Sequence, residues 1–160
     1  EPAIPYLINL IKIGDFWIKK SSAKAIEKIG VVSVPHLIET IKNENAPEVS
    51  VVCFEILKKI KTKALPQLIL FVDDSNQKIS QFVIQLLQKV GPSYSESAPE
   101  IANLVSHDRP LVRKSAAWSL DRIGFFSDEI IQKLEKALEL DSDPETKHII
   151  EQTLAKLKAS

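Results

Sequence analysis

A motif of one proline followed by apolar residues recurs along the chain at an almost constant spacing. Four copies read Pro5-Tyr-Leu-Ile, Pro35-His-Leu-Ile, Pro66-Gln-Leu-Ile and Pro99-Glu-Ile-Ala, at successive steps of 30, 31 and 33 residues. A period in this range is typical of repeat proteins, in which each copy is one small supersecondary unit. The spacing therefore predicts an array of similar units rather than one irregular bundle.

A second set of positions, about 13 residues after each proline, repeats independently of the first. We call its five members the reference positions: Ile18, Val49, Ile79, Val112 and Thr146. Mostly apolar or small residues follow each of them after four, eight and eleven residues, which is the spacing of one helix face. We expect these columns to be buried and the residues two, six and nine positions later to face solvent.

Each unit is predicted to hold two short helices and no strand. A proline suits the start of the first helix, and a polar break containing Asp15, Asn45, Asn76, Asp108 or Asp143 caps the second. Gly30, Gly91 and Gly124 follow the second helix, where left-handed C-caps are expected. We predict a single all-α domain over 1–160, an α-solenoid superhelix of five repeats at about 2–30, 31–61, 62–91, 92–124 and 125–158.

Composition narrows the class of protein further. Hydrophobic residues make up 44% of the 160 residues and charged ones 26%, which is typical of a globular chain. Cys53 is the single cysteine, so no internal disulfide can form and a cytoplasmic location is expected. No apolar run has the roughly 20 residues of a membrane span. The sequence contains no methionine, so we expect a trimmed chain or a fragment of a longer protein.

The fourth copy resembles a known repeat family. Residues 110–124, Pro-Leu-Val-Arg-Lys-Ser-Ala-Ala-Trp-Ser-Leu-Asp-Arg-Ile-Gly, are similar to a HEAT repeat, more narrowly to the short HEAT-like repeat associated with phycobilisome lyases. The first copy matches with Lys19 in the position of Arg113, whereas the second and third have Ser50 and Ser80 there. The resemblance implies an armadillo-like solenoid fold and leaves the function open, because such arrays serve many functions.

No residue pattern predicts catalysis, a cofactor or a metal ion. His36, His107 and His148 lie in no His-Glu pair, which the resemblance would require of a HEAT-repeat hydroxylase of the deoxyhypusine type. The acidic runs at 73–74 and 141–145 suit helix caps better than a cation site, because an EF-hand loop needs Gly and Glu at positions that hold other residues here. Cys53 falls in a buried column and is expected to be inert.

One aromatic residue is out of place in the solvent-facing columns. Trp118 lies six residues after its reference position, where the other copies have Lys24, Glu55, Gln85 and Gln152. Lys114 and Arg122 lie four residues on either side of it, and Trp with Arg is the composition of interaction hot spots. Either this is a binding site or Trp118 packs on the next unit. The candidate partner-binding residues are Trp118, Lys114, Arg113, Arg122 and Lys89, with Phe16 and Trp17 as a second aromatic candidate.

A basic residue follows every reference position after ten residues. The column consists of Lys28, Lys59, Lys89, Arg122 and Lys156. It is either a stripe for an acidic partner or a set of cations that stabilise the last turns of helices, where the macrodipole favours positive charge.

The sequence favours a non-catalytic scaffold or adaptor that binds a protein partner on the second helices of its repeats. The alternative is a subunit or fragment of a phycobilin lyase or isomerase that handles a tetrapyrrole. DNA binding is a third possibility, which the net charge of zero disfavours. No membrane partner is expected, and the open ends of an array allow end-to-end self-association.

Overall fold

The computed structural model describes residues 3–158, without the side chains of residues 61, 157 and 158. In this range the chain consists of α-helices and short 3-10 helices, with no strand. It divides into two compact units, Glu1–Leu68 and Ile69–Ser160. We describe each unit by itself, and the prediction of one domain with five repeat boundaries stays a prediction.

The first unit contains α1 (Ala3–Ile13), α2 (Phe16–Ile29), α3 (Val34–Asn43) and most of α4 (Pro47–Ile69). Helix α1 packs against both α2 and α3. The Asp15 side chain caps α2 as predicted, because its Oδ1 accepts a 2.9 Å hydrogen bond from the amide of Ile18. The single-turn helix η1 (Gly30–Ser33) joins α2 to α3.

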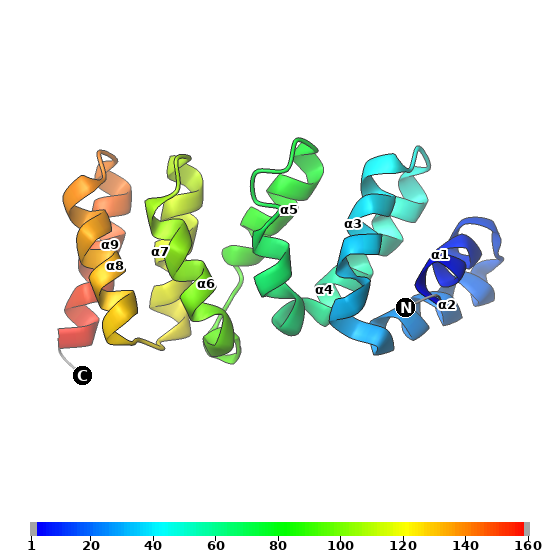
Figure 1. Ribbon diagram of the computed structural model, residues 1–160, viewed down its shortest axis with the longest axis horizontal. Helices are drawn as coiled ribbons and strands as arrows, with labels where there is room; N and C mark the ends of the chain where they lie inside the picture. The colour runs from blue at the N-terminus through cyan, green and yellow to red at the C-terminus, as the bar shows by residue number, and fades with distance from the viewer. Residues whose placement is uncertain (1–2, 159–160) are drawn as a thin grey trace. The chain divides into compact units, whose positions relative to one another are not determined.

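The second unit contains five α-helices in two layers (Figure 1). Its helices are α5 (Gln77–Leu87), α6 (Ala98–Asn103), α7 (Pro110–Ile123), α8 (Asp128–Leu140) and α9 (Pro144–Lys158), with η2 (Pro92–Ser97) and η3 (Leu104–Ser106) beside α6. Helices α5, α7 and α9 contact one another in sequence, and α6 contacts α8. We call the helices that carry the reference positions, α2, α4, α5, α7 and α9, the B helices.

The predicted core columns are largely buried in the structure, with two exposed members in the first repeat and a half-buried one, Ile60, in the second. The residues four and eight positions after every reference position are buried: Ser22, Cys53, Val83, Ala116, Ile150, Ile26, Leu57, Leu87, Leu120 and Leu154. Ile18 and Ile29, in contrast, are exposed, Ile18 to 42%. The side chain of Leu157, in the column eleven positions later, lies outside the described residues.

The third repeat departs from the predicted two-helix pattern. A new helix is expected to begin at Pro66, but α4 continues through Pro66 to Ile69. Gly30, Gly91 and Gly124 follow the second helix in the first, third and fourth copies, but the second copy has Lys61 at this position. No glycine is therefore present to end α4 before Pro66. The second helix of one repeat and the start of the next therefore form one helix of 23 residues.

The glycine and aspartate caps agree only partly with the expectation. Gly30 and Gly124 have positive φ angles of 79° and 65°. Gly91 has φ −157° and ψ −166°, which is extended backbone, because α5 ends early at Leu87 and residues 88–90 form a turn. Arg109 rather than Asp108 occupies the N-cap position of α7, without a capping side-chain bond.

Candidate functional site

Trp118 lies on the outer face of α7, the face formed by the residues two, six and nine positions after the reference position. Its side chain is 48% exposed, while Ala116, Ala117 and Ser119 beside it in the sequence are buried. Gln85 of α5 and Gln152 of α9 hold the same position in the adjacent repeats and are exposed. A large aromatic surface is therefore accessible in the middle of a polar column.

Arg122 lies near the C-terminal end of α7, and Lys89 lies in the turn that follows α5, the adjacent B helix. Arg122 is one helical turn beyond Trp118, and its Nη1 donates a 2.8 Å hydrogen bond to the backbone oxygen of Gln88. That bond holds the Arg122 guanidinium at the peptide unit that precedes Lys89, which is exposed. The structure thus brings together three of the predicted partner-binding residues. We call Trp118, Arg122 and Lys89 the aromatic-cationic patch.

Lys114 lies on the other side of Trp118 and is engaged with the next repeat. Its Nζ is 2.7 Å from Oε1 of Glu145, near the start of α9. The Glu145 side chain is well exposed, so this surface ion pair contributes little to stability and a partner can compete for either group. Lys114 therefore borders the aromatic-cationic patch as a neutralised cation.

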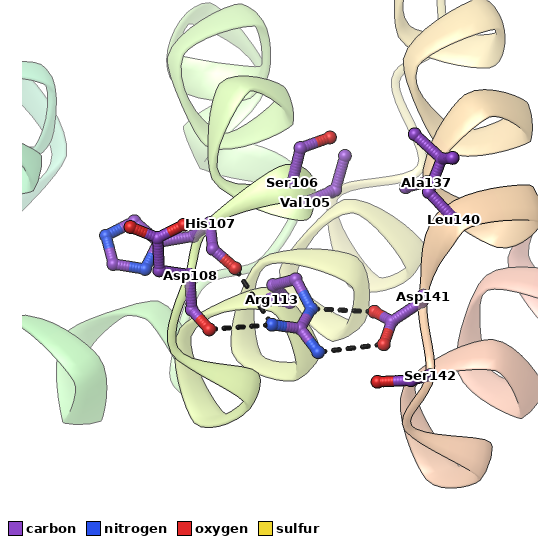
Figure 2. A pocket seen from close by; sticks show the side chains of 9 residues that line it. All are labelled: Val105, Ser106, His107, Asp108, Arg113, Ala137, Leu140, Asp141 and Ser142. Carbon is purple, nitrogen blue, oxygen red and sulfur yellow. Dashed lines mark hydrogen bonds and ion pairs between the residues drawn. The ribbon is translucent and has the colours of Figure 1, made fainter.

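Arg113 does not lie on this face, although the sequence groups it with Trp118. Its guanidinium makes two bonds to the carboxylate of Asp141, Nε to Oδ2 at 2.7 Å and Nη2 to Oδ1 at 2.8 Å. Nη1 donates to the backbone oxygens of His107 and Asp108, both at 2.9 Å (Figure 2). The Arg113 side chain is 13% exposed and that of Asp141 1%. Arg113 thus joins α7 to the loop before α9, and its guanidinium is used within the fold.

The ion pair has a clear electrostatic consequence for Asp141. Hydrogen bonds from Arg113 hold the pKa of Asp141 below its usual range, although burial acts in the opposite direction. The backbone amide of Asp143 adds a further bond to Asp141 Oδ1 at 2.8 Å. The carboxylate is therefore charged and fully used within the fold.

A hollow of about 290 Å³ opens beside this ion pair. It is lined by nine residues, Val105, Ser106, His107, Asp108, Arg113, Ala137, Leu140, Asp141 and Ser142 (Figure 2). Its central charges, Arg113 and Asp141, already satisfy each other. The volume is at the low end of the range for small-molecule sites.

A second cluster, which the sequence did not predict, fills the position of the missing arginine in the third repeat. Ser80 stands where the fourth repeat has Arg113, and Arg109 of the following repeat donates to its Oγ at 2.9 Å and to the Val72 oxygen at 3.0 Å. His107 Nδ1 accepts from the Arg109 amide, so Nε2 carries the hydrogen and donates to Asp73 at 2.8 Å. His107 is therefore a bridge between loops, with both ring nitrogens occupied.

Three members of the basic column, Lys59, Arg122 and Lys156, link successive repeats within their own unit. Lys59 Nζ lies 2.6 Å from Glu27 in the first unit. In the second unit Arg122 reaches Gln88, and Lys156 Nζ lies 2.7 Å and 2.8 Å from the two oxygens of Asp121. In each case the cation lies ten residues after the reference position of its own repeat. It contacts the residue that lies nine positions after the reference position of the preceding repeat. The available sequence signal was this neighbouring column, which holds Glu27, Lys58, Gln88, Asp121 and Ala155.

The second aromatic candidate lies in the first unit. Phe16 and Trp17 are exposed and form an edge-to-face pair with ring centroids 5.4 Å apart. Lys20 Nζ lies 5.6 Å from the Trp17 ring centre, within cation–π range. An apolar hollow of about 390 Å³ beside Trp17 is lined by Leu7, Leu10, Trp17, Ile18, Ser21 and Ser22.

Neither Cys53 nor the acidic residues form a reactive or metal-binding group among the described residues. The Cys53 thiol is buried, and burial raises its pKa to about 11, so it is a thiol at neutral pH. Across the described part of the chain, no three His, Cys, Asp or Glu side chains gather as a metal-binding group. Within the same residues no helix is both long and apolar enough to cross a membrane.

Comparison with known proteins gives a family match and two partial relatives. The family model for HEAT repeats matches residues 65–155. Epoxyqueuosine reductase of Bacillus subtilis (strain 168) is 40% identical over 67 residues, which are 41% of this chain and 17% of that protein. An "uncharacterized protein in gldA 3′ region" of Geobacillus stearothermophilus is 40% identical over 62 residues, 38% of this chain and 28% of that protein. The chain therefore spans less than a third of the length of either relative.

A solved structure resembles the chain over nearly its whole length. It is the complex of CpcE and CpcF of phycocyanin lyase from Nostoc sp. PCC7120, with 17% identity, a TM-score of 0.50, and coverage of 96% of this chain and 98% of that chain. At this identity the likeness concerns the fold alone. With the family match it confirms the predicted all-α solenoid of HEAT-like repeats.

Proposed function

The chain belongs to the HEAT-repeat family, and from this premise we propose that it is a protein-binding scaffold without catalysis of its own. The proposed binding face is the outer face of the B helices in the second unit, centred on Trp118. The observation that carries the proposal is the half-exposed tryptophan with Arg122 one helical turn away, and with Arg122 bonded to the Gln88 oxygen next to Lys89. Trp and Arg are the residues in which binding energy most often concentrates.

The backbone beneath the aromatic-cationic patch is well suited to binding. Trp118 and Arg122 stand on one helix, α7, whose opposite side is buried through Val112, Ala116 and Leu120. Arg122 is already tied to the Gln88 oxygen, so its side chain loses less conformational freedom when a partner arrives. A rigid surface of this kind supports affinity without a preformed pocket.

The tetrapyrrole alternative has support from the fold likeness and from two side chains of the same open surface. A bilin would need to lay its rings on an aromatic surface and place its propionates on cations, and Trp118 with Arg122 supplies both groups. Three hollows of about 290–390 Å³ are lined by residues within 105–142, 5–43 and 7–22. Neither Trp118 nor Arg122 lines any of them. The scaffold function therefore accounts for the open surface more directly.

The test is affinity capture from a lysate of the organism that encodes the chain, with wild type beside Trp118→Ala. Trp17→Ala is the matched control, because it removes a tryptophan that is 70% exposed in the other unit. We expect a partner that wild type and Trp17→Ala retain and Trp118→Ala loses, with all three equally helical by circular dichroism. Retention by all three variants contradicts the proposed face.

Two further arms of the same experiment examine the other functions. A shift of bilin absorbance on mixing with the chain, absent for Trp118→Ala, would support the tetrapyrrole alternative over the scaffold. Retarded migration of a DNA fragment at low and moderate salt would support nucleic-acid binding. Neither result is expected, because the chain carries no net charge and its exposed aromatic surface is confined to a few residues.

A further inference from the structure

We infer that the aromatic-cationic patch recognises an acidic peptide segment that carries an apolar or aromatic side chain between its carboxylates. This inference rests on the proposed protein-binding function and adds the chemistry of the partner. The occupant we assign is a segment of another protein, held by charge at Arg122 and Lys89 and by ring contact at Trp118.

The cations of this face differ in the groups that they bind. Lys114 pairs with Glu145, and Lys156 binds both oxygens of Asp121. Arg122 instead donates to a neutral backbone oxygen, and the described residues place no carboxylate against Arg122 or Lys89. Of the cations around the exposed ring, Lys114 is therefore neutralised by Glu145, whereas Arg122 and Lys89 keep their charge without a carboxylate among the described residues.

The position of these two cations favours paired carboxylates. The Arg122 guanidinium lies at the Gln88 carbonyl, one peptide unit from Lys89, so one segment can reach both. The planar guanidinium binds a carboxylate through two parallel hydrogen bonds, and Lys89 adds a point charge. Trp118 is one helical turn away on the same helix, where a neighbouring apolar side chain of the segment can lie on its ring.

The charges around the patch disfavour a nucleic acid. A phosphate backbone needs a run of cations along its track. Here Asp121, Glu145 and Glu151 interrupt the positive charge on the same layer of helices, and Glu145 and Glu151 are exposed. A short acidic segment needs only the patch, and Asp121 beside it is already neutralised by Lys156.

A second copy of this chain is also a poor occupant. The most acidic run of the chain, residues 141–145, is committed within the fold. Asp141 is bound to Arg113, Asp143 accepts from the Thr146 amide and hydroxyl, and Glu145 pairs with Lys114. Asp141 and Asp143 are held by bonds within the fold, and Glu145 already has a cation, so we assign the carboxylates to another protein.

The test uses the intrinsic fluorescence of Trp118 in the full chain. The chain has two tryptophans, so Trp17→Phe leaves Trp118 as the sole one. The probe is a blocked peptide, Glu-Glu-Phe-Glu-Glu, titrated at low salt, and the control probe is its charge-reversed form, Lys-Lys-Phe-Lys-Lys. We expect saturable change of Trp118 emission and protection from acrylamide quenching with the acidic peptide only, abolished near 1 M salt, where the Debye length is about 3 Å.

Variants locate the binding within the patch. In the Trp17→Phe background, Arg122→Ala and Lys89→Ala are each expected to lower the affinity for the acidic peptide about fivefold or more, since each removes one charge-assisted contact. Lys136→Ala is the matched control, an exposed lysine of α8 outside the B layer, and should leave affinity unchanged. Circular dichroism melting checks that each variant is folded.

The outcomes separate this inference from the proposed function. Equal affinity for both peptides, equal loss in Lys136→Ala, or no emission change up to millimolar peptide overturns the acidic-segment inference. In each case a Trp118-dependent partner from the capture experiment still upholds the scaffold function. Tighter binding of a single-stranded oligothymidylate than of the acidic peptide would overturn the inference in favour of nucleic acid.

Discussion

At the scale of single residues, two glycines in the same sequence column have different tasks. Gly124 ends α7 in the left-handed conformation, with φ 65° and ψ 18°. Gly91 is extended and adopts a backbone that any residue can take. No atom lies within 4 Å of a Cβ added at either position, so the difference between them is conformational alone.

We therefore expect Gly124→Ala to lower the free energy of unfolding by about 1–2 kcal/mol, the cost of left-handed backbone in an L-residue. Gly91→Ala should be neutral or slightly stabilising, because alanine restricts the unfolded chain. Urea denaturation followed by circular dichroism measures both. Equal destabilisation by the two substitutions would show that φ is not the cause.

Asp141 makes stability depend on acid. An unfolded aspartate titrates near pH 3.9, whereas bonds from Arg113 lower the pKa of Asp141 in the folded protein. The stabilisation is therefore complete above the unfolded pKa and is lost as the pH falls through the lower folded pKa. Glu44, Glu129 and Asp143 also have lowered pKa values, so they contribute in the same direction.

We expect Asp141→Asn to be less stable than wild type at pH 7 and to lose less stability between pH 5 and pH 2.5. Urea midpoints at several pH values in this range provide the measurement. The remaining lowered carboxyls keep part of the slope in the variant. A variant with the same pH dependence as wild type would remove Asp141 from the account of acid sensitivity.

At the scale of helices, prolines and glycines allow most of the elements to be predicted. Helices α2, α3, α6, α7 and α9 begin within two residues of an expected cap or proline. The failure at α4 has a local cause, since Pro66 suggests a start while Lys61 replaces the glycine that ends the other helices. Proline occurs in the first turn of a helix and also, at a cost of one hydrogen bond, in the interior of a helix. The proline motif alone cannot tell which of these two positions Pro66 holds.

Because α4 continues through Pro66, we expect Pro66→Ala to stabilise the protein. If Pro66 began a helix, the same substitution would be expected to destabilise it. Inside a helix, Pro66 lacks the amide that would bond the preceding turn, so Pro66→Ala should restore that bond. We expect a gain of about 1–2 kcal/mol, less than the roughly 3 kcal/mol difference in helix propensity because alanine frees the unfolded chain. Thermal denaturation is the measurement. A loss of stability would indicate that Pro66 begins a separate helix.

The candidate site was predictable only where one helix determines it. The helical wheel of α7 places Trp118 and Arg122 on one outer face, and the structure agrees. The same wheel could not separate Arg113, whose partner Asp141 is 28 residues away in the next repeat. The Arg109 cluster with Ser80 and Asp73 likewise joins residues 29 and 36 apart, which no single-helix pattern contains.

At the scale of the whole molecule, repeat proteins are stabilised by contacts between neighbours. Removing one member of a buried ion pair leaves an uncompensated charge, at a cost of about 3–5 kcal/mol. We expect Arg113→Ala to have this effect and to accelerate amide hydrogen exchange in α7, α8 and α9. Exchange in α2 and α3, in the other unit, should stay at the wild-type rate.

Lys114→Ala is the control for that experiment. It breaks an exposed ion pair with Glu145, and we expect a change within about 0.5 kcal/mol. Hydrogen exchange monitored by mass spectrometry resolves the helices in both variants. Uniform acceleration along the chain in Arg113→Ala would mean that the chain unfolds as one cooperative block.

The basic column has a meaning for how such a chain can grow during evolution. In three copies the cation meets the residue one column earlier in the copy that precedes it, and a repeat such as the fourth carries both an acceptor, Asp121, and the following cation, Arg122. When a gene segment that encodes one repeat is duplicated in tandem, both halves of the new junction are inherited together. The junction therefore needs no second mutation to close, and the array can lengthen one repeat at a time.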